Sequence, residues 1–382
     1  MARVRALRTD PVKHASTLHA RSELLRSQGR YQQARSLCLR SLALLKGLPK
    51  SSHQEVAEVI QTLAATCEDC GDYADSEKLY QRSLRLLGRT RTESAVNSLR
   101  VRALVSLGGL CVLRGRYKQA KQRYLRARAL VEVSFGAKSP EMTAVLNGLG
   151  VLCKYTGRFR SAERFYKQAL AIANRILGRD HPALASLYHN LGGLEHSRGR
   201  FARAEPFARH AVQVREKALG PTHPEVAADV AALAAILDAQ GKYKEAEKLY
   251  NRALAVFRRT YGPNHYEIAV TLGNLAAMNQ ARGRYQAAER QCRLALAIKD
   301  KVLGPGSPDA ALTRNNLGKL LTDVGRPRDA VQLLKAAVAT LEDRLASGHT
   351  HLSKARENLR KAAQSLTKHR APKRAETIEV KN

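Results

Sequence analysis

The chain has 382 residues, of which 44% are hydrophobic, and a formal net charge of +33 that comes from 66 basic and 33 acidic residues. This composition excludes an intrinsically disordered chain. We find no run of 18 apolar residues and no apolar segment behind the basic start, so we expect neither a membrane span nor a secretory signal, and a cytoplasmic protein. The positive charge favours anionic partners, although a charged surface without a specific role explains it equally well.

A short phrase recurs along the chain: a glycine, usually a basic residue, usually an aromatic residue, and a small residue five positions after the glycine. The glycines are Gly29, Gly71, Gly115, Gly157, Gly199, Gly241, Gly283 and Gly325. They are spaced by 42 residues, except for one interval of 44. A fixed period of this size predicts stacked repeats that bury their apolar faces against one another. We therefore expect a solenoid of eight repeats over residues 14–345, preceded by an N-terminal arm at residues 1–13.

The first two repeats depart from the pattern. Their second helices are expected to end early, at Gly47 and Gly88, and residues 89–98 replace the usual connector, which explains the 44-residue interval. Arg21 stands where most later repeats have leucine. The first repeat is therefore predicted to be a solvated cap of the stack.

The repeat around Gly157 shows how one unit is built. Ser139 and Pro140 are expected to open a first helix, because serine is a favoured N-cap and proline is favoured at the first helical position. Apolar residues recur at helical spacing up to Gly157, which accepts the left-handed conformation that ends many helices. A second helix with its own apolar stripe is predicted over residues 159–177.

Leucines at helical spacing predict one more helix over residues 350–369, beyond the last repeat. We assign residues 346–370 to a helix that caps the exposed end of the stack. The polar residues 371–382 are expected to form a flexible tail.

The repeats share fixed columns: in most of them leucine lies eight residues before the glycine, glycine or alanine lies seven before it, and alanine lies five and twelve after it. Gly192, in the second of these columns, is expected to lie at a close helix contact that a leucine would overpack. These columns resemble the tetratricopeptide repeat. The 42-residue period and the Leu-Gly-x-x-His-Pro connectors that begin at Leu177 and Leu219 resemble its kinesin light chain subgroup. The resemblance implies an all-α, right-handed α-solenoid superhelix of about eight helix pairs with a C-terminal capping helix.

In tetratricopeptide proteins the first helices line a concave groove, and an asparagine there commonly holds the backbone of an extended peptide. The corresponding first-helix asparagines are Asn147, Asn190, Asn274, Asn315 and Asn316. The resemblance implies that they bind peptide groups, since an amide side chain both donates and accepts hydrogen bonds. Lys154 and Lys319 are predicted near the same surface, where they would meet acidic side chains or a terminal carboxylate. The alternative is that these amides satisfy local polar groups or face water.

A basic residue directly follows seven of the eight repeat glycines. This basic ladder consists of Arg30, Arg116, Arg158, Arg200, Lys242, Arg284 and Arg326. Along one edge of a superhelix it would follow a nucleic acid or an acidic protein segment. The alternative is that exposed turns are charged without a binding role.

The Cys67–Cys70 pair has the spacing of a metal or redox motif. However, Cys67 shares its column with Cys111 and Cys153, so buried, reduced thiols are expected. We find no phosphate-binding loop and no nucleophile elbow in the sequence. The histidines that recur at 42-residue steps are expected to be connector residues near helix starts: His181, His223 and His265.

The sequence thus predicts a non-enzymatic scaffold or adaptor, without cofactor, metal or catalytic residues, that binds an extended and acidic peptide segment in its groove. A nucleic-acid-associated protein held by the basic ladder is the alternative. A module that serves only self-assembly is a third possibility, and the oligomeric state stays open.

Overall fold

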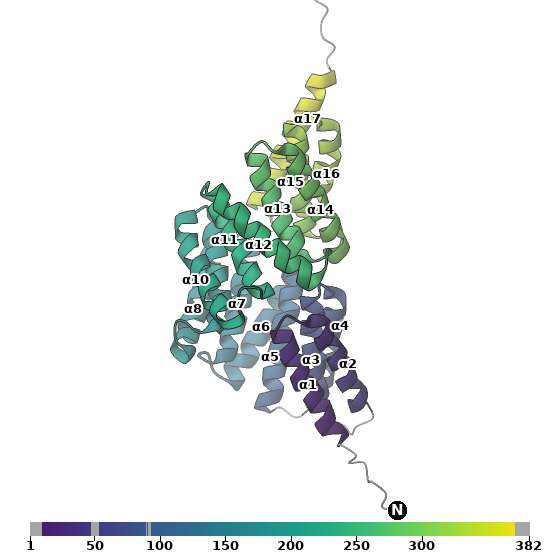
Figure 1. Ribbon diagram of the computed structural model, residues 1–382, viewed down its shortest axis with the longest axis vertical. Helices are drawn as coiled ribbons and strands as arrows, with labels where there is room; N and C mark the ends of the chain where they lie inside the picture. The colour runs from purple at the N-terminus through teal and green to yellow at the C-terminus, as the bar shows by residue number, and fades with distance from the viewer. Residues whose placement is uncertain (1–9, 47–52, 89, 91–92, 371–382) are drawn as a thin grey trace, which may run out of the picture. The chain divides into compact units, whose positions relative to one another are not determined.

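The computed structural model describes residues 10–46, 53–88, 90 and 93–370, and this part of the chain contains helices and no strand (Figure 1). The α-helices are α1 (Pro11–Ser27), α2 (Tyr31–Leu45), α3 (His53–Asp69), α4 (Tyr73–Leu87), α5 (Ser94–Leu113), α6 (Tyr117–Ser134), α7 (Pro140–Tyr155), α8 (Phe159–Leu177), α9 (Ala185–Ser197), α10 (Phe201–Leu219), α11 (Pro224–Ala239), α12 (Tyr243–Tyr261), α13 (Tyr266–Ala281), α14 (Tyr285–Leu303), α15 (Pro308–Asp323), α16 (Pro327–Arg344) and α17 (Thr350–Arg370). A short 3-10 helix, η2 (Pro182–Leu184), precedes α9.

In the first of two compact units (unit 1) the helices pack in consecutive pairs from α1 with α2 to α11 with α12, and in the second (unit 2) α15 packs with α16; neighbouring helices within each unit share apolar cores. The predicted all-α stack of helix pairs, followed by one more helix, is confirmed. The start of the solenoid differs from the prediction. The helix α1 begins at Pro11, because the Asp10 carboxylate accepts a hydrogen bond from the Val12 backbone N–H at 3.0 Å. Residues 1–9 of the predicted arm, Gly47 and the predicted tail at residues 371–382 lie outside the described residues.

The turn at Gly157 shows how each helix pair is joined. Gly157 has a φ of +75°, and its N–H donates to the Lys154 carbonyl at 3.1 Å, while the Arg158 N–H donates to the Cys153 carbonyl at 2.8 Å. These two bonds form a Schellman motif, which needs a left-handed residue at this point. All eight repeat glycines have a positive φ, as the sequence predicts.

The helix starts are capped by histidines more often than we expect from the sequence. The Nδ1 atoms of His181, His223 and His265 each accept a hydrogen bond from the backbone N–H two residues on, at 3.2, 3.2 and 3.3 Å. They are therefore connector residues at helix starts, as predicted. Ser139 does precede α7, but its side chain makes no capping hydrogen bond, so the expected serine cap is wrong in this respect.

The small-residue columns let aromatic rings enter the helix contacts. The Tyr124 ring lies so close to Gly108 and Gly148 that a Cβ atom on either glycine would overlap it. At Gly192, by contrast, an added Cβ would be 3.4 Å from the Ala204 carbonyl oxygen, which leaves room for one methyl group. The expected close helix contact at Gly192 is therefore present, but the contacts at Gly108 and Gly148, which face the Tyr124 ring, are tighter.

The helix α5 is long and apolar enough to cross a membrane by length and composition alone. However, 61% of its most apolar stretch is buried inside the protein, against α6 and α7 among others. Buried core helices of stacked repeats have this composition as well, so α5 is explained by packing.

The cysteine positions agree with the packing prediction. Cys67, Cys111 and Cys153 are buried in the helix contacts, while Cys70 is half-buried. Burial raises the pKa of both Cys67 and Cys70 to about 11. Both thiols are thus protonated at neutral pH and poor nucleophiles.

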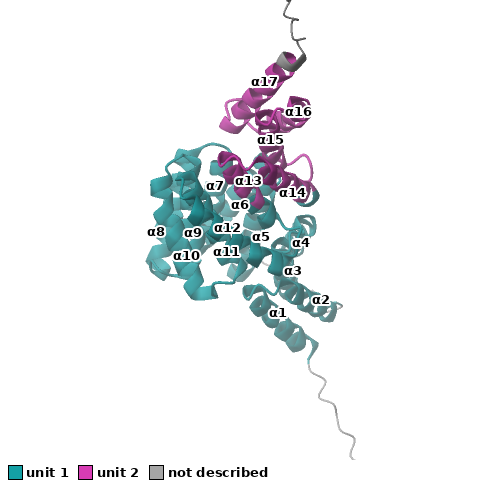
Figure 2. Cartoon of the chain, turned by 45° about the horizontal axis from the view of Figure 1, so that its top comes forward, with its two compact units in different colours: residues 1–271, 301–303 teal, residues 272–300, 304–382 magenta. Residues whose placement is uncertain are grey.

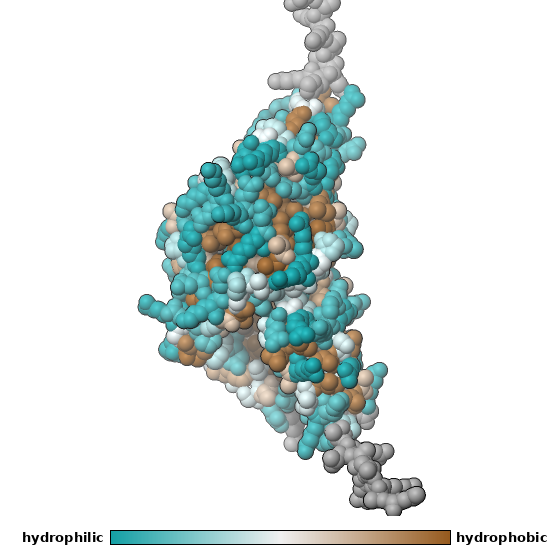
Figure 3. All heavy atoms as spheres, viewed as in Figure 1, coloured by the Kyte–Doolittle hydropathy of each residue, from teal (hydrophilic) through white to brown (hydrophobic). Residues whose placement is uncertain are grey.

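The chain divides into two compact units (Figure 2). Unit 1 comprises Met1–Thr271 with Lys301–Leu303, and unit 2 comprises Leu272–Asp300 with Gly304–Asn382. On the face seen in Figure 3, hydrophobic residues form separate patches among hydrophilic ones. Each unit is held together by contacts among its own residues.

Unit 1 closes on itself. The Tyr31 ring, at the start of α2, stacks on the Tyr261 ring at the end of α12, with centroids 5.7 Å apart. Tyr261 in turn stacks on His265, with centroids 3.7 Å apart. The His223 Nε2 atom lies 3.1 Å from the Ser27 carbonyl oxygen. The turn of the first repeat thus packs against two later connectors, so the first repeat is not the solvated cap that the sequence predicts, although Arg21 itself is exposed.

Candidate functional site

Two of the predicted groove residues meet directly. Asn147 on α7 and Asn190 on α9 are both half-buried, and the Asn190 Nδ2 atom donates to the Asn147 Oδ1 atom at 2.8 Å. The first helices of neighbouring repeats are thus joined by an amide pair. Each amide keeps further donor or acceptor capacity, because one such bond uses only part of what an amide offers.

Lys154 lies two helical turns after Asn147, on the same face of α7. Its Nζ atom reaches towards α9, where a Cβ added to Gly193 would be 3.4 Å away, and it lies 5.4 Å from the Tyr155 ring centroid. Burial lowers the pKa of Lys154 to about 8. No carboxylate among the described residues forms a salt bridge with it. We call Asn147, Lys154, Asn190 and Gly193 the α7–α9 patch.

Three further titratable residues, which the sequence pattern did not single out, lie three positions before their turn glycines, as Lys154 does: Glu68, His196 and Asp238. Burial raises the pKa of Asp238 to about 6, and burial, with a smaller contribution from the Asp69 charge, raises that of Glu68 to about 7. Burial, followed by the Lys154 charge, lowers the pKa of His196. A repeated column of shifted groups indicates a poorly solvated face in unit 1. Their common position, three residues before a turn glycine, is the sequence pattern that could have predicted them.

The other predicted groove residues belong to unit 2, so the structure does not join all five asparagines in one described site. Asn274 is half-buried and Asn316 is exposed. Asn315 is buried, and its Oδ1 atom accepts a hydrogen bond from Asn358 on α17 at 3.0 Å. Lys319 is exposed and forms a salt bridge with Asp323 at 3.0 Å. Asn315 and Lys319 thus already have partners within the chain.

The basic ladder is largely engaged in ion pairs. Arg116 pairs with Glu77 at 2.7 Å, Lys242 with Glu205 at 2.9 Å and Arg326 with Glu289 at 3.0 Å. In each of these pairs the carboxylate belongs to the preceding repeat, and the hydrogen bond from Lys242 is the largest cause that lowers the pKa of Glu205 to about 2.

The remaining ladder residues differ. Arg200 lies 3.7 Å from Glu195, and Arg158 donates to the Thr156 hydroxyl at 3.2 Å. Arg30 lines a cavity, and Arg284 is the N-cap residue of α14. Three of the seven ladder residues thus link one repeat to the next, and Arg158 and Arg200 interact with groups of their own repeat.

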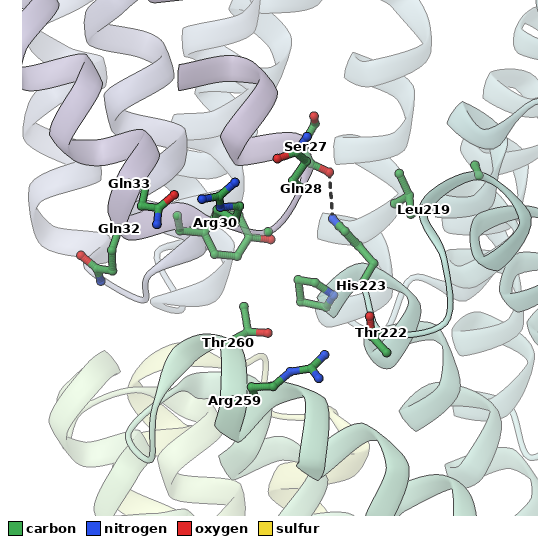
Figure 4. A pocket seen from close by; sticks show the side chains of 14 residues that line it. Ser27, Gln28, Arg30, Gln32, Gln33, Leu219, Thr222, His223, Arg259 and Thr260 are labelled. Atoms are coloured by element: carbon green, nitrogen blue, oxygen red, sulfur yellow. Dashed lines mark hydrogen bonds between the residues drawn. The ribbon is translucent and has the colours of Figure 1, made fainter. Parts of the chain in front are cut away.

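A cavity of about 660 Å³ lies where unit 1 closes (Figure 4). It is lined by the α1–α2 turn, the connector before α11 and the end of α12. Arg30 and Arg259 contribute its charges, and the His223 ring forms one wall. Within the described chain, no cluster of three or more metal-ligating side chains is present here or elsewhere.

Two family models match this chain. The model described as a MalT-like TPR region matches residues 91–270, and the one described as a tetratricopeptide repeat matches residues 13–88 and 267–343. Between them they include all eight turn glycines. The chain belongs to the tetratricopeptide repeat family. Its 42-residue period and His-Pro connectors fit the kinesin light chain-like subgroup of tetratricopeptide proteins.

The chain is also similar to solved structures. A Rap protein complexed with competence and sporulation factor is 13% identical, with a TM-score of 0.58 over 93% of this chain and 98% of that one. A kinesin light chain-like protein of P. anserina, with nearly identical TPR-like repeats, is 25% identical, with a TM-score of 0.42 over 50% of this chain and 91% of that one. BtubC from P. vanneervenii is 22% identical, with a TM-score of 0.43 over 66% and 93%.

No curated protein matches the sequence. The Rap likeness shows the fold, and the tetratricopeptide family consists in general of protein-interaction scaffolds. The chain is thus a tetratricopeptide scaffold for protein–protein interaction.

Proposed function

We propose that the chain is a non-enzymatic adaptor that binds an extended, acidic peptide segment against the α7–α9 patch. The observation that carries this proposal is the Lys154 amine: it is poorly solvated, it has no carboxylate partner in the described chain, and it points at the neighbouring helix beside Gly193. Lys154 is half-buried, and a poorly solvated ammonium group that lacks a counter-charge favours a carboxylate ligand.

The amide pair supplies the second part of the site. Asn147 and Asn190 lie on the same face as Lys154 and bind each other at 2.8 Å. Their remaining donors and acceptors suit the N–H and C=O groups of an extended backbone. The Rap protein, which has the same fold, is complexed with competence and sporulation factor. This complex supports the proposal that a chain of this fold binds a partner molecule.

The alternative, nucleic-acid binding through the basic ladder, receives less support. Phosphate binding needs cations whose charge is available. Arg116, Lys242 and Arg326 are instead held by carboxylates at 2.7–3.0 Å. The described contacts therefore favour peptide binding over phosphate binding by the ladder.

The test begins with a random peptide library displayed against the full chain, followed by measurement of the dissociation constant of a selected peptide. We expect Lys154→Met to weaken binding at least tenfold. The matched control is Lys118→Met, since Lys118 is exposed on α6 outside the patch. The double change Asn147→Ala with Asn190→Ala removes both partners of the amide pair, and we expect it to weaken binding without unfolding the chain.

The pH dependence provides an independent measurement. The protonated amine binds the ionised carboxylate, so affinity should be constant from about pH 6, where the ligand carboxylate is ionised, to the Lys154 pKa of about 8, and fall by up to about tenfold per pH unit above it. An ordinary lysine, with a pKa of about 10.4, would keep its affinity to about pH 10. Equal dissociation constants for the Lys154 and Lys118 variants, or constant affinity up to pH 9.5, would contradict the proposal.

A further inference from the structure

A second cavity in unit 1, of about 680 Å³, lies between α4, α5 and α6 and shares no residue with the α7–α9 patch. Three leucines supply its apolar part. Leu104 is buried, and Leu84 and Leu130 are half-buried. The volume is within the range of small-molecule sites in proteins.

Four arginines line this cavity: Arg85, Arg100, Arg123 and Arg126. No aspartate or glutamate lines it. Among the described residues, the guanidinium groups of Arg85, Arg123 and Arg126 form no salt bridge. Nearby arginines behave differently, since both Arg114 and Arg116 pair with Glu77. The nearest carboxylate that the charge of Arg123 acts on is Glu77, which is already paired with Arg114 and Arg116. The cavity therefore concentrates positive charge without a direct ion pair of its own among the described residues.

Arg100 is fixed in place by neutral acceptors. Its guanidinium donates to the Asn97 Oδ1 atom at 2.9 Å and to the carbonyl oxygens of Leu87 at 2.8 Å and Thr90 at 3.3 Å. These bonds orient the group and place it at the C-terminal end of α4, but they leave its formal charge uncompensated. A preorganised cation of this kind is suited to an anionic ligand.

The length of α4 explains why the space is open. The helix α4 has 15 residues and ends at Leu87, whereas α8, α10, α12 and α14 each have 19. The missing four residues correspond to about 6 Å of helix. Gly88, directly after the shortened end, lines the cavity. The irregular 44-residue interval thus coincides with a space of the size that binds small molecules.

We propose that this cavity binds an organic phosphate, in which the guanidinium groups hold a dianionic phosphate and the leucines contact an apolar group attached to it. A single carboxylate would neutralise only one of the four cations. A phosphate monoester carries a charge of about −1.5 to −2 at pH 7 and accepts bidentate bonds from several guanidinium groups. The leucines favour an ester with an apolar part over the free inorganic ion.

The experiment uses the full chain and phenyl phosphate, with calorimetric titration at low and constant ionic strength. Inorganic phosphate and phenylacetate are the comparison ligands, because one lacks the apolar group and the other lacks the second charge. We expect phenyl phosphate to bind at least tenfold more tightly than either. Hydrogen exchange should show added protection in residues 81–88 and 123–130.

The variant Arg123→Gln with Arg126→Gln should weaken phenyl phosphate binding at least tenfold. The matched control, Lys118→Gln with Lys121→Gln, removes the same charge from exposed positions of the same helix that do not line the cavity. Thermal melts of both variants check that the fold is intact. Equal loss of affinity in the two double variants, or phenyl phosphate binding no tighter than inorganic phosphate, would overturn the proposal.

Discussion

Gly150 and Gly192 occupy the same column of their repeats but have different surroundings. An added Cβ on Gly150 would overlap the ring of Tyr166, which is completely buried, whereas one on Gly192 would be 3.4 Å or more from the atoms of α10. The difference comes from the column nine residues after the turn glycine, which holds Tyr166 in one repeat and Ala208 in the other. Equivalent glycines therefore differ in how much they contribute to stability.

We expect Gly150→Ala to lower the free energy of unfolding by about 1–3 kcal/mol, because the Tyr166 ring must move out of its packed position. Gly192→Ala should instead leave stability unchanged or raise it by up to about 1 kcal/mol, since alanine favours the helix. Urea denaturation of both variants measures the difference. Equal changes in stability for the two variants would show that the Tyr166 ring does not prevent a larger side chain at position 150.

At the scale of elements, ion pairs connect several of the repeats to the repeat that follows. Glu77, Glu205 and Glu289 lie six residues after their turn glycines and pair with a cation of the following repeat. Glu77 is 13% exposed and accepts bonds from both Arg114 and Arg116, so it is the best shielded of these three carboxylates. The charges of the basic ladder thus help to fix the spacing of the stack.

The change Glu77→Gln should lower the free energy of unfolding by about 1–2 kcal/mol, because two partly buried arginines lose their counter-charge. Glu132→Gln is the matched control: Glu132 pairs with Arg128 within α6 and is 42% exposed, so its loss should cost less than about 0.5 kcal/mol. Chemical denaturation at low and high salt tests both. The hypothesis fails if Glu77→Gln is as mild as the control.

The helices themselves are predictable from local sequence. The predicted second helix at residues 159–177 agrees with α8 at both ends, and the last helix differs by one residue. Glycine turns and apolar periodicity act within a few residues, so a single sequence reveals them. The amide pair Asn147–Asn190 and the ion pairs depend on the packing of repeats, so the sequence indicates their columns without indicating their partners.

At the scale of the whole molecule, the closure of unit 1 is the feature that the sequence did not reveal. Whether Tyr31 reaches Tyr261 depends on small rotations between successive repeats that add up along the solenoid. The sequence pattern within one repeat does not indicate this accumulated rotation. The same limit applies to Lys154, whose lowered pKa arises from the surroundings that the folded unit creates.

The change Tyr261→Leu should release the first repeat, because it removes the one ring that stacks on both Tyr31 and His265. We expect amide exchange in α1 and α2 to accelerate at least tenfold, while α7 to α10 change little. Tyr188→Leu serves as the control, since Tyr188 contacts His210 away from the closure. Uniform acceleration throughout unit 1 would argue against a local role for this contact.

The helix α17 corresponds to the first helix of a ninth repeat. His349 caps it as the other connector histidines cap theirs, and Asn358 binds Asn315 as Asn190 binds Asn147. Duplication of the last 42-residue repeat ahead of α17 would therefore keep both the histidine cap of α17 and its amide pair with the preceding first helix. The only new junction in such a longer array would be the one between the repeat and its copy.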